Sequence, residues 1–111
     1  MKRGDLVTIV VNGDYGKPRP AFILQSDAFE LLPSVTVLQI TSDVHDEHLA
    51  RITVNPSLEN GLRERSQVMI DRAMTVPRTK VGRVFGHLDN ETIANINKAV
   101  VLFLGLGASP V

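Results

Sequence analysis

Short apolar segments separated by turn-forming residues occupy the first three quarters of this chain. Most are rich in β-branched residues or alternate apolar with polar positions, which is typical of strands. The expected strands cover residues 6–11, 20–25, 35–40, 51–54, 67–76 and 80–85. A single helical turn is expected at 26–30, where Asp27 and Glu30 form a capping pattern and Pro33 follows.

One long amphipathic segment lies near the C-terminus. Asp89 is a suitable N-cap, Leu88 and Ile93 stand at the two positions of a hydrophobic staple, and Gly105 is placed to end the helix. Apolar residues recur there with a 3.6-residue period: Ile93, Ile96, Val100, Phe103 and Leu104. Many short strands followed by one helix predict a mainly β fold in one domain, residues 1–111, with a strongly curved antiparallel sheet or barrel and a C-terminal helix.

The composition fits an ordinary globular domain, with 43% hydrophobic and 22% charged residues among 111. The chain contains no cysteine, which excludes disulfides, thiolate metal sites and cysteine nucleophiles. No apolar run approaches the roughly 20 residues of a membrane span. The apolar stretch 6–11 is interrupted by Thr8 and followed by Asn-Gly-Asp, so we interpret it as a strand rather than an export signal. A cytoplasmic protein is expected.

The formal net charge is zero, but the charges are unevenly distributed along the chain. Residues 26–60 hold six acidic side chains against a single arginine, and residues 63–83 hold six basic side chains against two acidic ones. A molecule polarised in this way can hold a polyanion on one face, although charges scattered over a solvated surface give the same counts.

Arg19 is the first residue whose setting suggests chemistry. It lies between Pro18 and Pro20, which restrict the backbone on both sides. A guanidinium held in this way can bind a phosphate through two parallel hydrogen bonds. The alternative is an ordinary surface arginine in a stiff turn.

Two hydroxyls, Thr41 and Ser42, follow the most clearly patterned strand. Hydroxyls at a strand end can contact a phosphate and stabilise its transition state, or they can cap the following turn. Asp71 and Arg72 lie side by side in a later strand, either as a functional pair or with Asp71 as a structural hydrogen-bond acceptor.

The three histidines give weaker signals. His45 and His48 bracket Asp46 and Glu47, but no third ligand is marked out, so neither a metal ion nor another cofactor is expected. His87 could act as a general base, or it could be an exposed residue before the helix.

Several short motifs, matching in order and spacing over nearly the whole chain, resemble those of the MazF/PemK family of toxins. The motifs are Arg3-Gly4-Asp5, Pro18-Arg19-Pro20-Ala21, Gln25-Ser26-Asp27, Ile40-Thr41-Ser42, Val68-Met69-Ile70-Asp71-Arg72, Thr75-Val76, Gly82-Arg83 and Leu104-Gly105-Leu106. The resemblance implies an SH3-like barrel with a terminal helix, the fold shared with the gyrase-poisoning CcdB toxins. It also implies a homodimer that cleaves single-stranded RNA at a short sequence, and a small antitoxin protein as partner.

The resemblance assigns Arg19 as the catalytic arginine, Thr41 as the catalytic threonine and Ser42 as their neighbour. We expect metal-independent attack of the ribose 2′-hydroxyl on the adjacent phosphorus, leaving a 2′,3′-cyclic phosphate. Lys17 and Arg72 are candidate contacts to the RNA backbone, and Tyr15 and Phe22 are the candidate stacking residues. Asp14 and Asp71 are further substrate-binding residues and candidate bases, because the first loop lacks the Glu or His with Gln that family members often carry.

Two alternatives stay open at this level. One is a non-enzymatic toxin of the same fold that poisons gyrase. The other is an SH3-like binding module, although such modules usually present an aromatic-lined groove and this chain contains only 5% aromatic residues.

Overall fold

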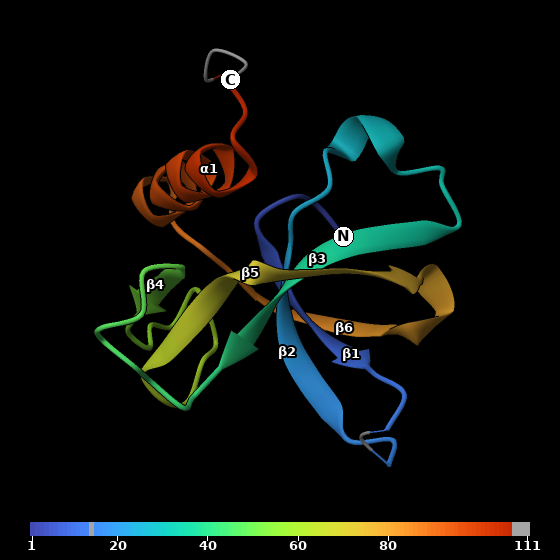
Figure 1. Cartoon of the computed structure of the whole chain (residues 1–111). Helices are drawn as coiled ribbons and strands as arrows, with labels where there is room; N and C mark the ends of the chain where they lie inside the picture. The colour runs from blue at the N-terminus through green and yellow to red at the C-terminus, as the bar shows by residue number, and fades with distance from the viewer. Residues whose placement is uncertain (14, 108–111) are drawn as a thin grey trace.

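The computed structural model describes residues 1–13 and 15–107, which form one curled antiparallel sheet and a C-terminal helix (Figure 1). The strands are β1 (Asp5–Val10), β2 (Pro18–Ile23), β3 (Ser34–Thr41), β4 (Arg51–Val54), β5 (Ser66–Pro77) and β6 (Val81–His87). Two short 3-10 helices, η1 (Asp27–Phe29) and η2 (Arg78–Lys80), and the helix α1 (Asn90–Leu104) complete the fold. The predicted mainly β architecture with a C-terminal helix is confirmed, as is the helical turn at η1.

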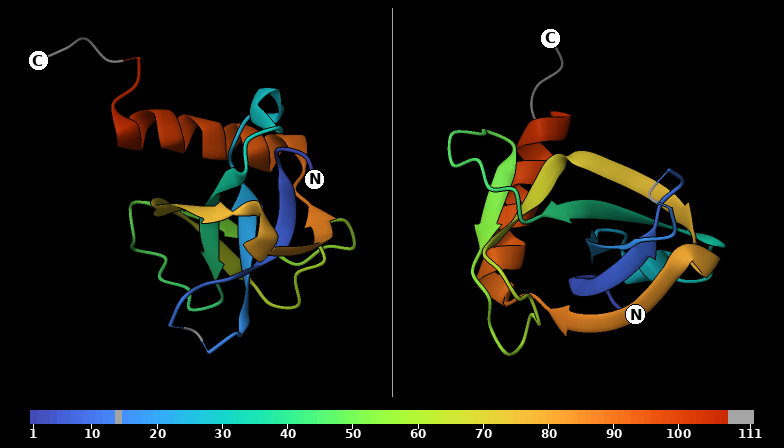
Figure 2. Two further views of the ribbon diagram at one scale, coloured as in Figure 1. Left: turned by 90° about the vertical axis from the view of Figure 1, so that its right-hand side faces the viewer. Right: turned by 90° about the horizontal axis from the view of Figure 1, so that it is seen from below.

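The sheet order is β4-β5-β3-β2-β1-β6, so β4 and β6 are its two edges. The strands curl around a common axis, as the view from below shows (Figure 2). The curl is that of an SH3-like barrel, but no ladder joins β4 to β6 in the described residues, and the sheet stays open.

Because the sheet is curled, both faces of its central strands are buried. In β3, the neighbouring residues Val37 and Leu38 point to opposite faces, and both are fully buried. Leu38 belongs to a cluster under α1 that also includes Phe22 and Ile96, whereas Val37 belongs to a second cluster with Ile9 and other aliphatic residues. Two small cores on opposite faces therefore fix the register of β3.

A break in the ladder bends β5 in its middle. Leu38 of β3 pairs with Ala73, but Ile40 pairs with Val68, so residues 69–72 of β5 stand opposite Gln39 alone. Extra residues in one strand bend it and re-aim their side chains. This segment contains Asp71 and Arg72.

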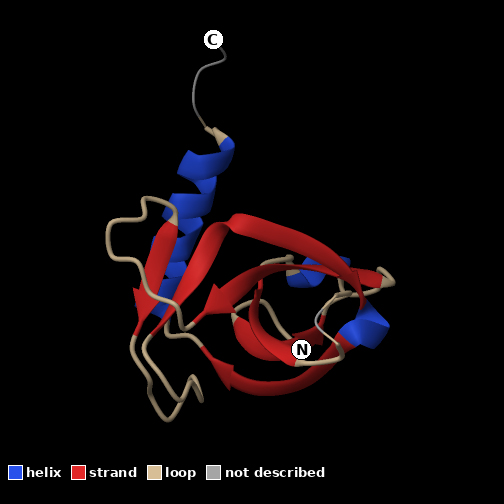
Figure 3. Cartoon of the chain, turned by 60° about the horizontal axis from the view of Figure 1, so that its bottom comes forward, coloured by secondary structure: helices blue, strands red, loops and turns tan. Residues whose placement is uncertain are grey.

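The helix α1 crosses one side of the sheet, and its last turns reach beyond the strands (Figure 3). Asp89 caps it by accepting a hydrogen bond from the Thr92 N–H at 3.0 Å, and Gly105 ends it with a φ of 71°. Ile96 is fully buried. The apolar residues of the last turns are exposed instead: Val101, Leu102, Phe103 and Leu104. None of the described helices is long and apolar enough to cross a membrane.

Arg3 joins the start of the chain to three other segments. Its backbone N–H donates to the Asp27 carboxylate at 2.7 Å, its Nε donates to the Leu24 carbonyl at 2.7 Å, and a terminal nitrogen donates to the Asn97 side chain at 2.8 Å. The Arg3-Gly4-Asp5 motif therefore has a structural role in closing the fold.

Candidate active site

The register of β2 and β3 relates Arg19 to Thr41. The last paired positions of these strands are Ala21 and Gln39. Arg19 and Thr41 each stand two residues beyond that pair, where the ladder has ended, and the alternation of side chains directs both toward the face of Ala21 and Gln39. The two residues predicted to be catalytic therefore lie at one end of two neighbouring strands.

The chain around Arg19 is held on its other side by β1. Arg19 pairs with Ile9, and the flanking residues Pro18 and Pro20 pair with Val10 and Thr8. The two prolines, which have no N–H to donate, lie where the ladder to β3 has already ended. This arrangement fixes the backbone of Arg19 while leaving its side chain at the surface.

The Thr41 hydroxyl is oriented by the turn that follows it. Thr41 Oγ1 accepts a hydrogen bond from the Asp43 N–H at 3.0 Å. This is the strand-end capping considered from the sequence, and it leaves the hydroxyl hydrogen available for donation to another group. Ser42, the next residue, is exposed.

Gln67 anchors the loop after Thr41, a role that sequence reasoning missed. Its side chain is 2% exposed, and Oε1 accepts from the His45 N–H at 3.0 Å and from Arg51 at 3.2 Å. Its Nε2 donates to the His45 carbonyl at 3.3 Å and to the Thr53 hydroxyl at 3.1 Å. Arg51 also donates to the Asp43 carbonyl at 2.8 Å. The only sequence signal was an amide among the apolar residues of β5.

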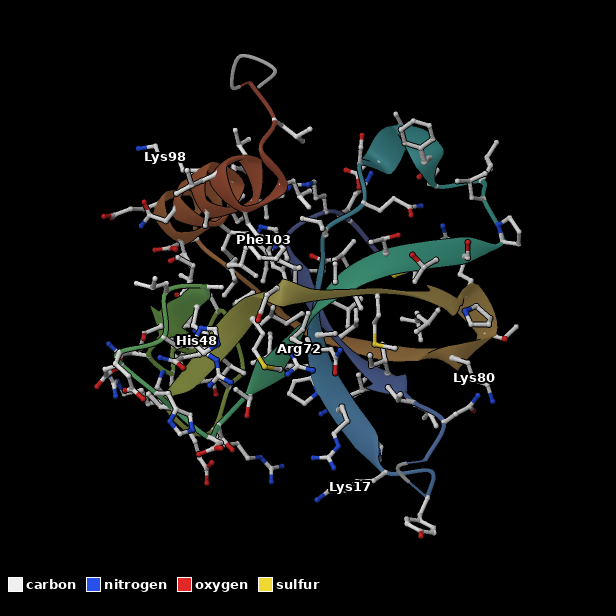
Figure 4. The ribbon with its side chains drawn as sticks, in the orientation of Figure 1. Lys17, His48, Arg72, Lys80, Lys98 and Phe103 are labelled. Atoms are coloured by element: carbon white, nitrogen blue, oxygen red, sulfur yellow. The ribbon has the colours of Figure 1, made fainter. Side chains whose placement is uncertain are left out.

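Asp71 and Arg72 point in different directions, because successive side chains of a strand alternate. Asp71 lines a hollow under α1 with Phe103 and Leu104, and its Oδ2 lies 3.9 Å from His48 Nε2. The Arg72 side chain is exposed, and its carbonyl accepts a hydrogen bond from Gln39 at 3.4 Å. In the view of Figure 4, Arg72 lies between His48, which is in the loop before β4, and Lys17, which immediately precedes β2.

The first loop supplies the other predicted contacts. Lys17 immediately precedes β2 and is exposed. Tyr15 is fully exposed and has a φ of 53°, which is uncommon for a residue other than glycine. Phe22, the other stacking candidate, is fully buried in the core, so the prediction that it stacks on a base is wrong. Asp14 lies outside the described residues.

The histidines lie beside carboxylates. His45 lies between the carboxylates of Asp43 and Glu47, at 3.2 and 3.4 Å. In the described part of the chain, no group of three His, Cys, Asp or Glu side chains is placed to hold a metal ion. His87 Nδ1 lies 2.8 Å from the Asp5 carboxylate, at the opposite end of β1 from the residue paired with Arg19. This distance along the strand separates His87 from the candidate site.

Comparisons with known proteins agree with this fold. The model of a family described as PemK-like, MazF-like toxin of type II toxin-antitoxin system matches residues 2–104. The chain is 39% identical over 107 residues to "Probable endoribonuclease MazF" of Mycolicibacterium smegmatis, covering 96% of this chain and 98% of the relative. It is 23% identical over 111 residues to "Endoribonuclease EndoA" of Bacillus subtilis, covering 96% of each chain.

Solved structures show the same fold. "Mycobacterium tuberculosis toxin MazF-mt6" superposes with a TM-score of 0.79 and 25% identity, covering 92% of this chain and 97% of that one. An endoribonuclease from a mycobacterial species, in complex with its cognate antitoxin, gives a TM-score of 0.82 at 20% identity, covering 98% and 99%.

The curled six-stranded sheet with its C-terminal helix is the fold of the MazF class of toxins. The chain belongs to the PemK-like, MazF-like toxins of type II toxin-antitoxin systems. Neither a gyrase poison nor an SH3-like binding module is favoured by these findings.

Proposed function

We propose that this protein is a cytoplasmic endoribonuclease that cleaves single-stranded RNA at a short sequence and is neutralised by an antitoxin protein. The main support is the β2–β3 pairing, because Arg19 and Thr41 each stand two residues beyond its last pair, Ala21 and Gln39, on neighbouring strands. The names of the relatives add support, because both curated relatives are called endoribonucleases.

The proposed reaction is a transesterification within the RNA. The ribose 2′-oxygen attacks the adjacent phosphorus while the bond to the 5′-oxygen breaks, which leaves a 2′,3′-cyclic phosphate and, after protonation, a 5′-hydroxyl. The phosphoryl oxygens gain negative charge in the transition state. Arg19 stabilises that charge by charge-assisted hydrogen bonds, and Thr41 donates its hydroxyl hydrogen.

The Asp43 amide strengthens the donor role of Thr41. It donates to Thr41 Oγ1, and a hydroxyl that accepts one hydrogen bond becomes a better donor of its own hydrogen. A threonine hydroxyl is too weak a base to take the proton from the 2′-hydroxyl. Asp14 and Asp71 are retained as the candidate bases, and Lys17, Arg72, Ser42 and Tyr15 as candidate RNA contacts.

The proposed homodimer rests on the exposed end of α1. Leu102 is 83% exposed, and Val101, Phe103 and Leu104 are also exposed on the turns that reach beyond the strands. Burial of apolar side chains against a second copy of this chain removes them from water. The antitoxin is proposed as a separate partner, since the solved mycobacterial relative is bound to its own.

The experiment is cleavage of a long single-stranded RNA by the purified protein in the presence of EDTA. Wild type is expected to produce discrete fragments with 2′,3′-cyclic phosphate ends. Arg19→Ala is expected to leave the RNA intact, whereas Arg63→Ala, which removes an exposed arginine outside the site, retains activity. Intact RNA with the wild-type protein would refute the proposal, and trapping of gyrase on DNA would then support the non-enzymatic alternative.

A further inference from the structure

Two basic side chains lie at the end of the sheet that carries Arg19, outside the contacts used above. Lys80 is the last residue of η2 and Arg83 follows in the edge strand β6, and both are exposed. The sequence marked Gly82-Arg83 as a motif, and the reaction proposed above gives no role to Lys80 or Arg83. These two side chains form the β6 basic strip.

The strand register places the β6 basic strip near Arg19. In β1, Ile9 pairs with Arg19 of β2 on one side and with Val81 of β6 on the other. Neighbouring strands lie about 5 Å apart, so the backbones of Arg19 and Val81 are roughly 10 Å apart. Lys80 immediately precedes Val81. The strip therefore begins two strands away from the proposed catalytic arginine.

Close packing against β1 fixes the backbone between the two basic residues. A Cβ atom at Gly82 would collide with the Thr8 hydroxyl, so only glycine lets the two strands approach this closely. Among the described strands, β6 pairs with β1 alone, and its last residue is covered by a loop, where the His87 N–H donates to the Glu59 carbonyl at 2.9 Å. The start of β6 is therefore held on one side and accessible on the other.

The cations of the strip are not used by the fold. Within the described residues, Lys80 and Arg83 make no ion pair and no side-chain hydrogen bond. Arg65, by contrast, lies 3.0 Å from the Asp46 carboxylate. Because no neighbouring carboxylate neutralises them, both cations remain available to an anionic ligand.

The chain around the strip is basic as well. No acidic residue occurs in the described strands and turns at this end, which are residues 8–13, 15–20 and 78–84. Their basic residues are Lys17, Arg19, Arg78, Lys80 and Arg83. In the view of Figure 4, Lys17 and Lys80 lie in the lower half of the molecule, whereas Lys98, on α1, lies at the top left. A cluster of positive charge of this kind attracts a polyanion.

The make-up of the strip suits a phosphate backbone better than a protein surface. Lysine and arginine side chains bind phosphates whichever base is attached. In β6, which the structure describes in full, Val84 is the one exposed apolar side chain, at 47%. The buried centre of a protein interface is usually apolar and aromatic, and β6 offers little of either.

We propose that the β6 basic strip binds phosphates of the RNA backbone on one side of the cleaved bond, with Lys80 and Arg83 as the contacts. The RNA strand then runs from Arg19 across β1 to η2 and β6. This inference rests on the proposed endoribonuclease activity and extends its substrate from one phosphate to a longer single strand. Because the strip lies two strands from Arg19, it contributes to binding and not to the chemical step.

The test measures cleavage of a long single-stranded RNA by Lys80→Ala, Arg83→Ala and the double variant. Lys98→Ala and Arg63→Ala are the matched controls, because each removes an exposed side chain of the same type elsewhere. The strip variants are expected to raise KM, most strongly at low salt, with kcat unchanged. The slope of log KM against log salt concentration is expected to fall by about 0.7 for each side chain removed. The controls are expected to match wild type.

Two further readouts separate backbone binding from other roles. The cleavage sequence, read from the fragment ends, is expected to stay the same, because phosphate contacts carry no base information. On a short RNA that extends only one nucleotide beyond the cleaved bond on each side, the strip variants are expected to match wild type, since the strip then has no phosphate to bind.

Unchanged KM and salt slope of the double variant on the long RNA would refute the strip while the endoribonuclease stands. The strip is also refuted if that variant keeps its KM for RNA but loses binding to polyglutamate, because the surface then serves an acidic protein. If wild type itself cleaves no RNA, the proposed function fails and the strip fails with it.

Discussion

The Thr41 hydroxyl accepts a hydrogen bond from the amide of Asp43 at 3.0 Å. The same contact ends strand β3 and orients the hydroxyl, so a capping role and a catalytic role are compatible in one side chain. Because the oxygen is already an acceptor, its hydrogen is the part left for a phosphoryl oxygen.

Removing the Thr41 hydroxyl is expected to lower kcat with little effect on folding. Thr41→Val keeps the shape of the side chain but loses the donor, and loss of one such donor costs about 10²–10³ in rate. Thr41→Ser keeps the donor and is expected to retain most of the activity. Single-turnover cleavage of a short RNA measures both, and full activity of Thr41→Val would exclude Thr41 from catalysis.

Arg19 is expected to require a guanidinium rather than any positive charge. Arg19→Lys keeps the charge but loses the two parallel donors, so we expect a clear loss of kcat, smaller than the roughly 10²–10³ loss of Arg19→Ala. Free guanidinium added to the reaction is expected to restore part of the activity of Arg19→Ala. It is expected to leave the rate of Arg63→Ala unchanged, because that variant retains its activity. Equal rates for Arg19→Lys and wild type would contradict the proposed phosphate contact.

The exposed end of α1 is expected to mediate dimerisation. Leu102→Lys introduces a charge at a residue that is 83% exposed in the single chain, so the monomer keeps its fold while association is weakened. Light scattering at micromolar concentration is expected to give a dimer for wild type and a monomer for the variant. Leu58→Lys serves as the control, and an unchanged dimer with Leu102→Lys would place the interface elsewhere.

Ile96 is expected to carry much of the attachment of α1 to the sheet. It is fully buried in the cluster with Phe22 and Leu38, and truncating such an isoleucine to alanine leaves a cavity that costs about 2–5 kcal/mol of unfolding free energy. Leu58→Ala, at a fully exposed site, is expected to change it by less than about 0.5 kcal/mol. Urea unfolding at one protein concentration measures both variants.

Asp89 is expected to make the helix start sensitive to acid. Hydrogen bonds from the Thr92 hydroxyl and then from its N–H lower the pKa of Asp89 below the ordinary 3.8. A lowered folded pKa means that the carboxylate stabilises the fold above the unfolded value and loses this contribution as the pH falls through the folded value. Asp89→Asn keeps a capping side chain without the charge, so its Tm deficit is expected at neutral pH and should disappear in acid. A deficit that persists at low pH would contradict this assignment.

Local patterns in the sequence determined most elements of this fold. The sequence correctly predicts the strand at residues 51–54, the Asp89 cap and the helix end at Gly105. Turn residues, caps and periodicity act within a few neighbouring residues, so they can be recognised locally. The sequence also marked Arg19 and Thr41, through the flanking prolines and the strand-end hydroxyl, but it left their relation open.

Only the tertiary structure decided how distant segments meet. Three features depend on residues far apart in the chain: the pairing that makes β2 and β3, which carry Arg19 and Thr41, neighbours, the extra residues 69–72 that bend β5, and the hydrogen bonds of Gln67. Burial on two faces selects one register among several that the strand patterns allow, and that selection appears only when the whole sheet has curled and packed. For the same reason, the sequence placed Phe103 and Leu104 on the apolar face of α1, but only the structure shows that they are exposed and line a hollow with Asp71.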